Sequence, residues 1–167
     1  MNPENGVVTI PANTPAGTYT ITYKECEALN PNSNCQTATA VIKVGTPTIT
    51  VVPDPMTVTP STTTQTIPSI LNNDKIGGTV TPTVGVGGNV TLTVTNPIGT
   101  KVPTLDRNTG EVTIPGNTPA GTYTISYTVC ERLNGNSNCQ SVTSQITIGG
   151  GNMTVTPTQL IVANGAT

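Results

Sequence analysis

The chain has 167 residues, a formal net charge of −2 and only 8% charged residues, so its length allows one or two ordinary domains. Six Lys and Arg and no His leave no basic patch to neutralise phosphates, which argues against a nucleic-acid partner. No stretch approaches the ~20 apolar residues that a membrane-spanning helix requires, so we expect no membrane span.

The composition favours β-structure throughout. Thr supplies 36 residues and Val 18, and β-branched side chains lose less freedom in a strand than in a helix. A chain rich in Thr and Pro is also typical of a disordered, mucin-like stalk. However, Val, Ile and Tyr alternate with Thr at a period of two, which a disordered segment does not need. The sequence therefore predicts an ordered all-β protein.

An internal repeat divides the chain. Residues 6–45 align with residues 110–149 at a constant offset of 104, and 27 of these 40 positions are identical. A period of about one hundred residues is typical of tandem domains rather than of a solenoid. We expect residues 1–46 to be the C-terminal part of a preceding repeat, 47–149 a complete repeat, and 150–167 the start of the following one.

Residues 1–46 predict the last three strands of a unit. The first is Gly6–Ile10, which ends at a corner over residues 11–17, because two Pro and a Gly cannot continue a ladder. A Tyr-containing strand then runs to Cys26, with Tyr and Ile on one face and Thr on the other. After a polar loop, Cys35–Val44 forms the last strand.

The middle of the chain predicts further short strands. A Pro-rich linker with an edge strand covers residues 46–60, and its segment Met56–Pro60 returns at 153–157, which marks the start of each repeat. The strands expected next are Thr64–Leu71, Thr79–Val84, Asn89–Thr95, Lys101–Leu105 and Glu111–Ile114, followed by a second Tyr strand. Seven or eight short strands in one hundred residues predict an immunoglobulin-like antiparallel β-sandwich.

Tyr19 and Tyr123 each follow a Pro-Ala-Gly corner and precede a buried strand position by two residues. A tyrosine corner occupies this place in immunoglobulin-like folds, where its hydroxyl bonds back to the backbone of the corner. We therefore expect both to be tyrosine corners.

The four Cys form two equally spaced pairs. In the second copy, residue parity places Cys130 and Cys139 on the same outward face of adjacent strands, so a disulfide between them is sterically reasonable, and likewise between Cys26 and Cys35. Zinc is the alternative, but two Cys without a His make a poor ligand set. Each loop closure would stabilise the fold by about 2.7 kcal/mol. Disulfides persist in oxidising places, so we expect an extracytoplasmic protein.

Several segments together resemble a known repeat type. They are residues 109–115, 118–127, Cys130-Glu131, Asn138-Cys139 and Ser69–Asp74. This pattern resembles the immunoglobulin-like repeats of giant surface adhesins of Bacteroidetes, including gliding-motility adhesins. The resemblance implies export by the type IX route and display outside the cell, on a filament attached to the outer membrane.

The sequence offers little for chemistry. It has no His and no Ser in a Gly-flanked nucleophile turn, so we expect no enzyme and no catalytic residue. Asp106-x-Asn108-x-Gly110 copies the opening of a calcium loop. A strand-connecting turn explains the same residues, and the closing acidic ligand is missing. We therefore expect no metal site and no cofactor.

Three roles remain for such a chain. The favoured one is a structural stalk or spacer of a large adhesin, whose partners are neighbouring repeats of the same chain. The alternative is an adhesive module that binds glycans or surfaces through its loops, with Glu131–Asn138 as the best contact surface. The near-identical loop in the first copy, beginning at Glu27, fits a spacer without any ligand. A third is association with other copies through the unpaired strand edges of residues 1–46.

Overall fold

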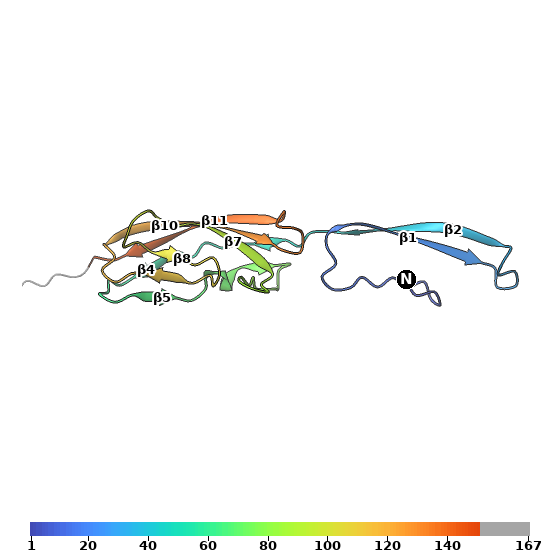
Figure 1. Cartoon of the computed structure of the whole chain (residues 1–167), viewed down its shortest axis with the longest axis horizontal. Helices are drawn as coiled ribbons and strands as arrows, with labels where there is room; N and C mark the ends of the chain where they lie inside the picture. Colours follow the sequence, from blue (N-terminus) through green and yellow to red (C-terminus); the bar gives the residue numbers. More distant parts are fainter. Residues whose placement is uncertain (151–167) are drawn as a thin grey trace, which may run out of the picture.

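The computed structural model describes residues 1–150, and apart from one short 3-10 helix its regular structure is β-strand (Figure 1). The elements in chain order are β1 (Gly17–Cys26), β2 (Cys35–Val44), β3 (Ile49–Thr50), β4 (Met56–Val58), β5 (Gln65–Ile67), η1 (Ile70–Asn73), β6 (Lys75–Ile76), β7 (Val90–Thr95), β8 (Thr104–Leu105), β9 (Val112–Ile114), β10 (Gly121–Glu131) and β11 (Cys139–Ile148). The segment 150–167 expected to begin another repeat lies, from residue 151 on, outside the described residues.

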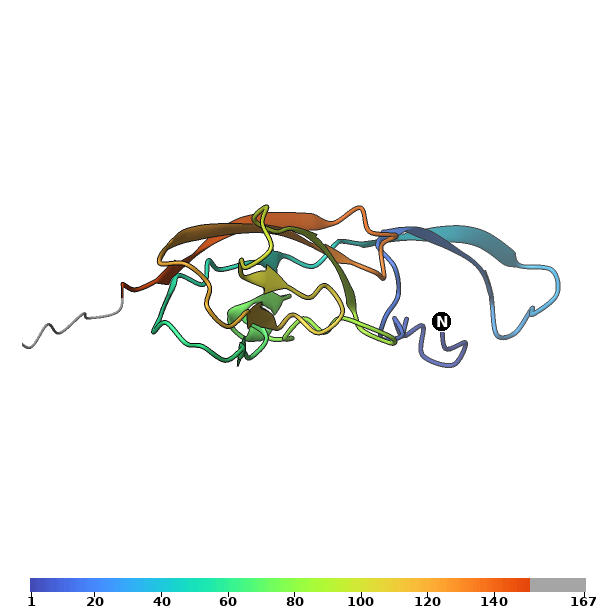
Figure 2. The ribbon, with the colours of Figure 1, turned by 60° about the vertical axis from the view of Figure 1, so that its left-hand side comes forward.

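Strands β3 to β11 form a two-layer sandwich (Figure 2). One layer has the strand order β4-β11-β10-β7, and the other contains β5-β9-β8 together with the short β3–β6 pair. All pairings are antiparallel except that of β4, which runs parallel to β11 with Met56 opposite Ile146. The chain therefore has the predicted all-β, immunoglobulin-like sandwich fold.

The core follows the two-residue period of the long strands. Ile125, Tyr127 and Val129 alternate along β10 and are buried against Leu71 and other side chains of the second layer. The outward side chains of β10 and β11 are mainly Thr and Ser, and they pair across the strands, as Thr128 and Ser141 do at 2.7 Å. This alternation is what a sheet with one dry face and one wet face requires.

Strands β1 and β2 form a separate hairpin that continues the long axis of the sandwich (Figure 1). We call residues 1–44 the hairpin unit. Its register, from Gly17 opposite Val44 to Cys26 opposite Cys35, is the same as that of β10 and β11. No second layer covers this hairpin within residues 1–150, so Tyr19 is 39% exposed. Residues 8–14 lie along its apolar face and enclose an open groove of about 410 Å³.

The strand expected over Gly6–Ile10 is absent. Its counterpart at the offset of 104 is β9, which is held between β5 and β8. The hairpin unit contains no equivalents of β5 and β8, so residues 6–10 have no neighbours with which to share ladder hydrogen bonds. An extended segment without such neighbours does not form a stable strand.

Three other expected strands are shorter than the sequence suggests, and the one expected over Lys101–Leu105 is reduced to Thr104–Leu105. The strand over Thr64–Leu71 ends at Ile67, because Pro68 has no N–H and Ser69 caps η1 by accepting the Leu71 N–H at 3.3 Å. The strand over Thr79–Val84 reduces to one bridge between Val80 and Ile76. Local turns thus replace the ladder hydrogen bonds after Ile67 and around Val80.

Both expected disulfides are present. Cys26 and Cys35 are directly opposed in β1 and β2, and Cys130 and Cys139 in β10 and β11, each pair with Cα atoms 4.1 Å apart. Each bond closes the base of the loop that joins its two strands.

Replacing Cys130 and Cys139 together by Ser should destabilise the sandwich by about 2–3 kcal/mol, because the unfolded chain gains the freedom of an open loop. Denaturant unfolding of the full chain, followed by circular dichroism, measures this loss. The matched replacement of Cys26 and Cys35 lies outside the sandwich and should leave its transition midpoint nearly unchanged. Equal effects of the two replacements would contradict this account.

Candidate functional site

The most specific polar contacts between the hairpin unit and the sandwich come from one loop, Glu131–Asn138, which joins β10 to β11. The Asn134 side-chain oxygen Oδ1 accepts the Ala16 backbone N–H at 2.7 Å. The Asn138 side-chain nitrogen Nδ2 donates to the Pro47 carbonyl oxygen at 2.8 Å. The loop therefore contacts both the corner before β1 and the segment that connects the two units, and we call this place the joint.

Glu131 organises the loop from inside. Its side chain is only 5% exposed, and its Oε2 accepts the Asn134 Nδ2–H at 2.7 Å and the Asn138 Nδ2–H at 3.1 Å. Hydrogen bonds to an ionised carboxylate are stronger than those between neutral groups. Because the amide nitrogen of Asn134 faces Glu131, the side-chain oxygen of Asn134 is directed to Ala16.

Arg132, the next residue, does not pair with Glu131. Its guanidinium donates to the Val90 carbonyl oxygen at 2.9 Å and to the Gly85 carbonyl oxygen at 3.1 Å. These contacts fasten the loop to β7 and to the turn before it. The loop is therefore held on the sandwich side by a charged side chain as well as by its own backbone.

On the other side of the joint, a rigid corner presents the Ala16 N–H. Tyr19 donates its hydroxyl to the Pro15 carbonyl oxygen at 2.8 Å, and Thr14 donates to the Pro11 carbonyl oxygen at 2.7 Å. Asn13 adopts a left-handed backbone with φ of 61°. The Tyr19 bond fixes the peptide group whose N–H belongs to Ala16, so this corner aims the donor at Asn134.

The second corner is built in the same way. Tyr123 donates to the Pro119 carbonyl oxygen at 2.8 Å, Thr118 donates to the Pro115 carbonyl oxygen at 2.7 Å, and Asn117 has φ of 60°. The corner lies at the end of the sandwich opposite the joint, since Gly121 pairs with Ile148 whereas Cys130 pairs with Cys139.

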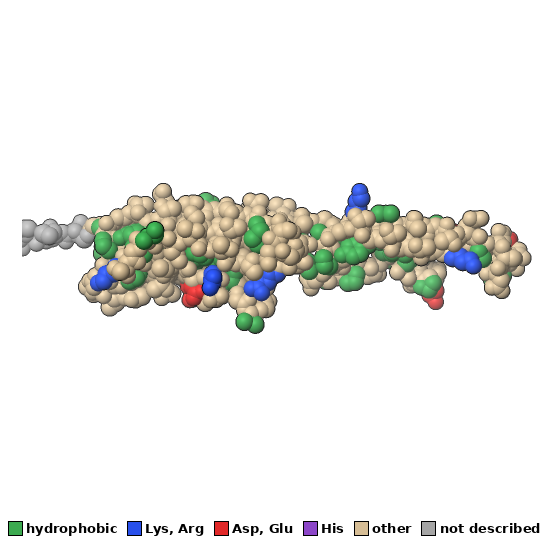
Figure 3. Space-filling model, turned by 45° about the horizontal axis from the view of Figure 1, so that its top comes forward, with side chains coloured by type: hydrophobic (Ala, Val, Ile, Leu, Met, Phe, Trp, Pro, Cys, Tyr) green, Lys and Arg blue, Asp and Glu red, His purple; other side chains and the backbone are tan. Residues whose placement is uncertain are grey.

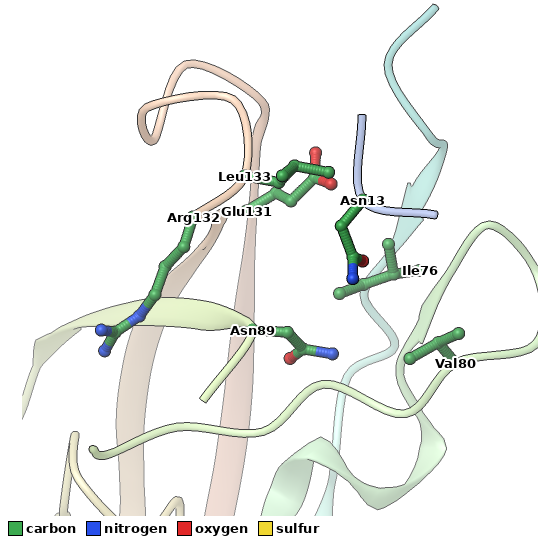
Figure 4. A pocket seen from close by; sticks show the side chains of 7 residues that line it. All are labelled: Asn13, Ile76, Val80, Asn89, Glu131, Arg132 and Leu133. Carbon is green, nitrogen blue, oxygen red and sulfur yellow. The ribbon is translucent and has the colours of Figure 1, made fainter. Parts of the chain in front are cut away.

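A cavity of about 420 Å³ lies at the joint (Figure 4). Its lining residues are Asn13, Ile76, Val80, Asn89, Glu131, Arg132 and Leu133. Asn13 comes from the hairpin unit and points toward Ile76, while the other six come from the sandwich (Figure 4). The Glu131 carboxylate is engaged by two amides, so the cavity is a gap between two packed parts with no group poised for acid–base chemistry.

An acidic pair that the sequence reasoning missed lies in the sandwich, with Asp74 buried and Asp54 half-buried. Asp74 is fully buried, and its Oδ1 accepts the Val52 N–H at 2.8 Å while its Oδ2 has no hydrogen-bond partner. Asp54 accepts the Tyr127 hydroxyl at 3.0 Å and an Asn73 Nδ2–H at 2.8 Å. Burial, and then the negative charge of Asp54, raise the pKa of Asp74 to about 6. The sequence feature that could have pointed to Asp74 was the run Leu71-Asn72-Asn73-Asp74.

The candidate calcium loop forms a turn between β8 and β9. Asp106 Oδ1 accepts the Asn108 N–H at 2.7 Å, and the Asp106 carbonyl accepts the Gly110 N–H at 2.8 Å with Gly110 at φ of 75°. These are the bonds of an Asx-stabilised turn. In the part of the chain that the structure describes, no three His, Cys, Asp or Glu residues come together as a metal site.

No family model and no curated protein matches this chain. Among solved structures, it is similar to the solution structure of the PKD domain from the KIAA 1837 protein, with 18% identity and a TM-score of 0.35. That match covers 64% of this chain and 92% of the other. The fold assignment rests on the strand pairing described above. No helix within residues 1–150 is long and apolar enough to cross a bilayer.

Lowering the pH from 7.5 to 5 should stabilise the sandwich against heat. The pKa of Asp74 is about 6 in the folded chain against an ordinary 3.8, so ionised Asp74 costs stability above pH 6, and this cost disappears as the pH falls toward 4. The negative charge of Asp54 opposes ionisation of this carboxyl, while the Val52 N–H and the positive charge of Lys75 favour it. Thermal unfolding at several pH values measures the effect.

Asp74→Asn should raise the melting temperature at pH 7.5 and flatten its pH dependence, because an amide oxygen can still accept the Val52 N–H. Asp106→Asn is the matched control: it also keeps its turn acceptor but lies at the surface. A wild-type melting temperature that falls steadily as the pH is lowered from 7.5 to 5 would contradict the buried charge.

Proposed function

We propose that this chain is a structural spacer of a large surface-displayed adhesin, with no catalytic role. The observation that carries the proposal is the joint, where Asn134 and Asn138 couple the loop of the sandwich to the corner and connector of the hairpin unit. A spacer must hold its two ends at a fixed separation. Directed hydrogen bonds between the ends of the two units restrict how one unit moves relative to the other. The Glu131 carboxylate at the edge of the cavity is engaged by the Asn134 and Asn138 amides.

The shape of the molecule supports this role. The hairpin and the sandwich lie end to end along one axis (Figure 1). Each contains strands of 10 or 11 residues, so each adds roughly 35 Å of reach. A long, thin arrangement of this kind separates whatever lies at its two ends.

The surface supports it as well. Charged side chains are few and separated on the face shown in Figure 3, and the outward positions of β10 and β11 are mainly Thr and Ser. A surface of this kind offers neither a basic nor an acidic patch for a charged partner. The two disulfides fit an oxidising, extracellular or secreted environment. We further propose, from the sequence resemblance alone, that the chain is displayed on a bacterial cell surface and has a link to gliding motility.

An adhesive module is the second candidate, because two loops of the sandwich expose large hydrophobic side chains. Val86 and Ile98 are fully exposed in the loops before and after β7. Hydrophobic loop tips are suited to contact with another surface. Binding of the chain to a glycan array, lost on replacing Val86 and Ile98 by Ser, would favour this role over a spacer.

The joint should make both units tumble as one body in solution. Asn134→Ala removes the bond to Ala16 and should let the hairpin unit reorient independently of the sandwich. ¹⁵N NMR relaxation detects this as a shorter rotational correlation time for the amides of β1 and β2 in the variant.

Asn30→Ala is a closely matched control, because Asn30 makes the same amide contact with Glu27 that Asn134 makes with Glu131 but lies at the far tip of the hairpin. At a concentration well below a millimolar, it should leave the correlation times of both units unchanged. Independent tumbling of the two units already in the wild-type chain would overturn the spacer proposal.

A further inference from the structure

The tip of the hairpin unit carries the same loop as the joint, already folded but without a neighbour. Glu27 Oε2 accepts the Asn30 Nδ2–H at 2.8 Å and the Asn34 Nδ2–H at 2.9 Å, and the Glu27 N–H donates to the Asn34 carbonyl at 2.9 Å. The Asn34 and Asn30 amides lower the pKa of this carboxyl. The corresponding bonds of Glu131 hold the loop at the joint, so the tip loop already has the geometry that receives a corner.

What distinguishes the two loops is their surroundings. Leu29 is 86% exposed, whereas its counterpart Leu133 lines the cavity at the joint and is 38% exposed. Asn30 Oδ1 accepts no hydrogen bond from residues 1–150, whereas Asn134 Oδ1 accepts the Ala16 N–H. The tip therefore presents an unused acceptor beside an exposed apolar side chain.

The matching donor lies at the other end of the described chain. The corner Pro115–Gly121 repeats the bonds of the corner that meets Asn134, including the Tyr123 contact with the Pro119 carbonyl. Its Ala120 is exposed, and the Ala120 N–H donates to no acceptor within residues 1–150. The two ends are thus complementary halves of a contact that the molecule already makes once internally.

We propose that copies of this chain associate head to tail through a second use of the joint. The corner Pro115–Gly121 of one copy seats on the tip loop Glu27–Asn34 of the next, where the Ala120 N–H donates to Asn30 Oδ1 and Leu29 is covered. Because the two surfaces are different and lie at opposite ends, the contact is heterologous and extends into rows of copies rather than closing into a dimer.

Three features of the chain point to a second copy of itself as the occupant. The internal joint shows how a corner and a loop fit together. The corner Pro115–Gly121 and the loop Glu27–Asn34 are already folded with the same hydrogen bonds. The Ala120 N–H and Asn30 Oδ1 both lie at the surface. The internal joint benefits from an effective concentration of about a millimolar supplied by its connector, and separate copies lack this advantage, so their association must be followed up to that concentration. This association goes beyond the spacer role, since the internal joint would remain if separate copies did not bind one another.

Sedimentation velocity of the full chain over a concentration series up to near-millimolar tests the proposal. Wild-type chain should show a sedimentation coefficient that rises with concentration. Leu29→Asp should abolish the rise, and this exposed site makes no contact on which folding depends. Val86→Asp is the matched control, because it makes a similar change at an equally exposed hydrophobic residue away from both surfaces.

Ala120→Pro removes the N–H donor at the opposite end and should also abolish the rise in sedimentation coefficient. If the proline variant does not fold, Ala120→Glu takes its place, because it would bring a carboxylate near Glu27. A mixture of Leu29→Asp and an Ala120 variant should form dimers and nothing larger, because each retains one working end. Association that survives Leu29→Asp would overturn the proposal and point instead to the open face of β1 and β2. A wild-type chain that stays monomeric throughout the series would also overturn it.

Discussion

The arrangement of this molecule depends on a buried carboxylate that orients two amides. Glu131 accepts hydrogen bonds from the amide nitrogens of Asn134 and Asn138. The Asn134 oxygen then accepts the Ala16 N–H of the corner, and the same Asn138 nitrogen also donates to the Pro47 carbonyl of the connector. A hydrogen bond between two chain segments has a modest net value, but its direction fixes how the segments meet. One acidic residue thus orients the amides that join the two units.

The other features of the loop and corner support this contact. The disulfide between Cys130 and Cys139 closes the base of the loop immediately beside Glu131. The Tyr19 hydroxyl fixes the Pro15 carbonyl and therefore the peptide group that carries the donor. Both elements recur with the same hydrogen bonds, in the corner Pro115–Gly121 and in the loop Glu27–Asn34. The repeat found in the sequence therefore includes the hydrogen bonds of corners and loops as well as the strands.

The long strands could be predicted from sequence because their alternation is strong and local. β2 has the predicted bounds, and the inward face of β10 follows from the parity of Ile125, Tyr127 and Val129. Strands that depend on neighbours were harder to predict. Residues 6–10 have the composition of a strand but lack partners, and the strand expected to reach Leu71 is cut short by Pro68 and the Ser69 cap.

The joint itself was only partly accessible from sequence. The near-identity of the two loops was visible, but the sequence gives no sign that Asn134 and Ala16 meet across 118 positions. The buried Asp74 was also missed, because its burial depends on a contact with Val52, 22 positions earlier in the chain. A polar residue in a short loop predicts a turn, and only the folded chain shows which turns are buried.

Small-angle X-ray scattering of the wild-type chain at low concentration tests the central claim most directly. If the joint holds the hairpin unit and the sandwich in line, the profile should fit one rigid, elongated body with the dimensions of the structure. A profile that requires a broad ensemble of bent and extended forms would show that the contact between Asn134 and Ala16 does not set the shape of the molecule.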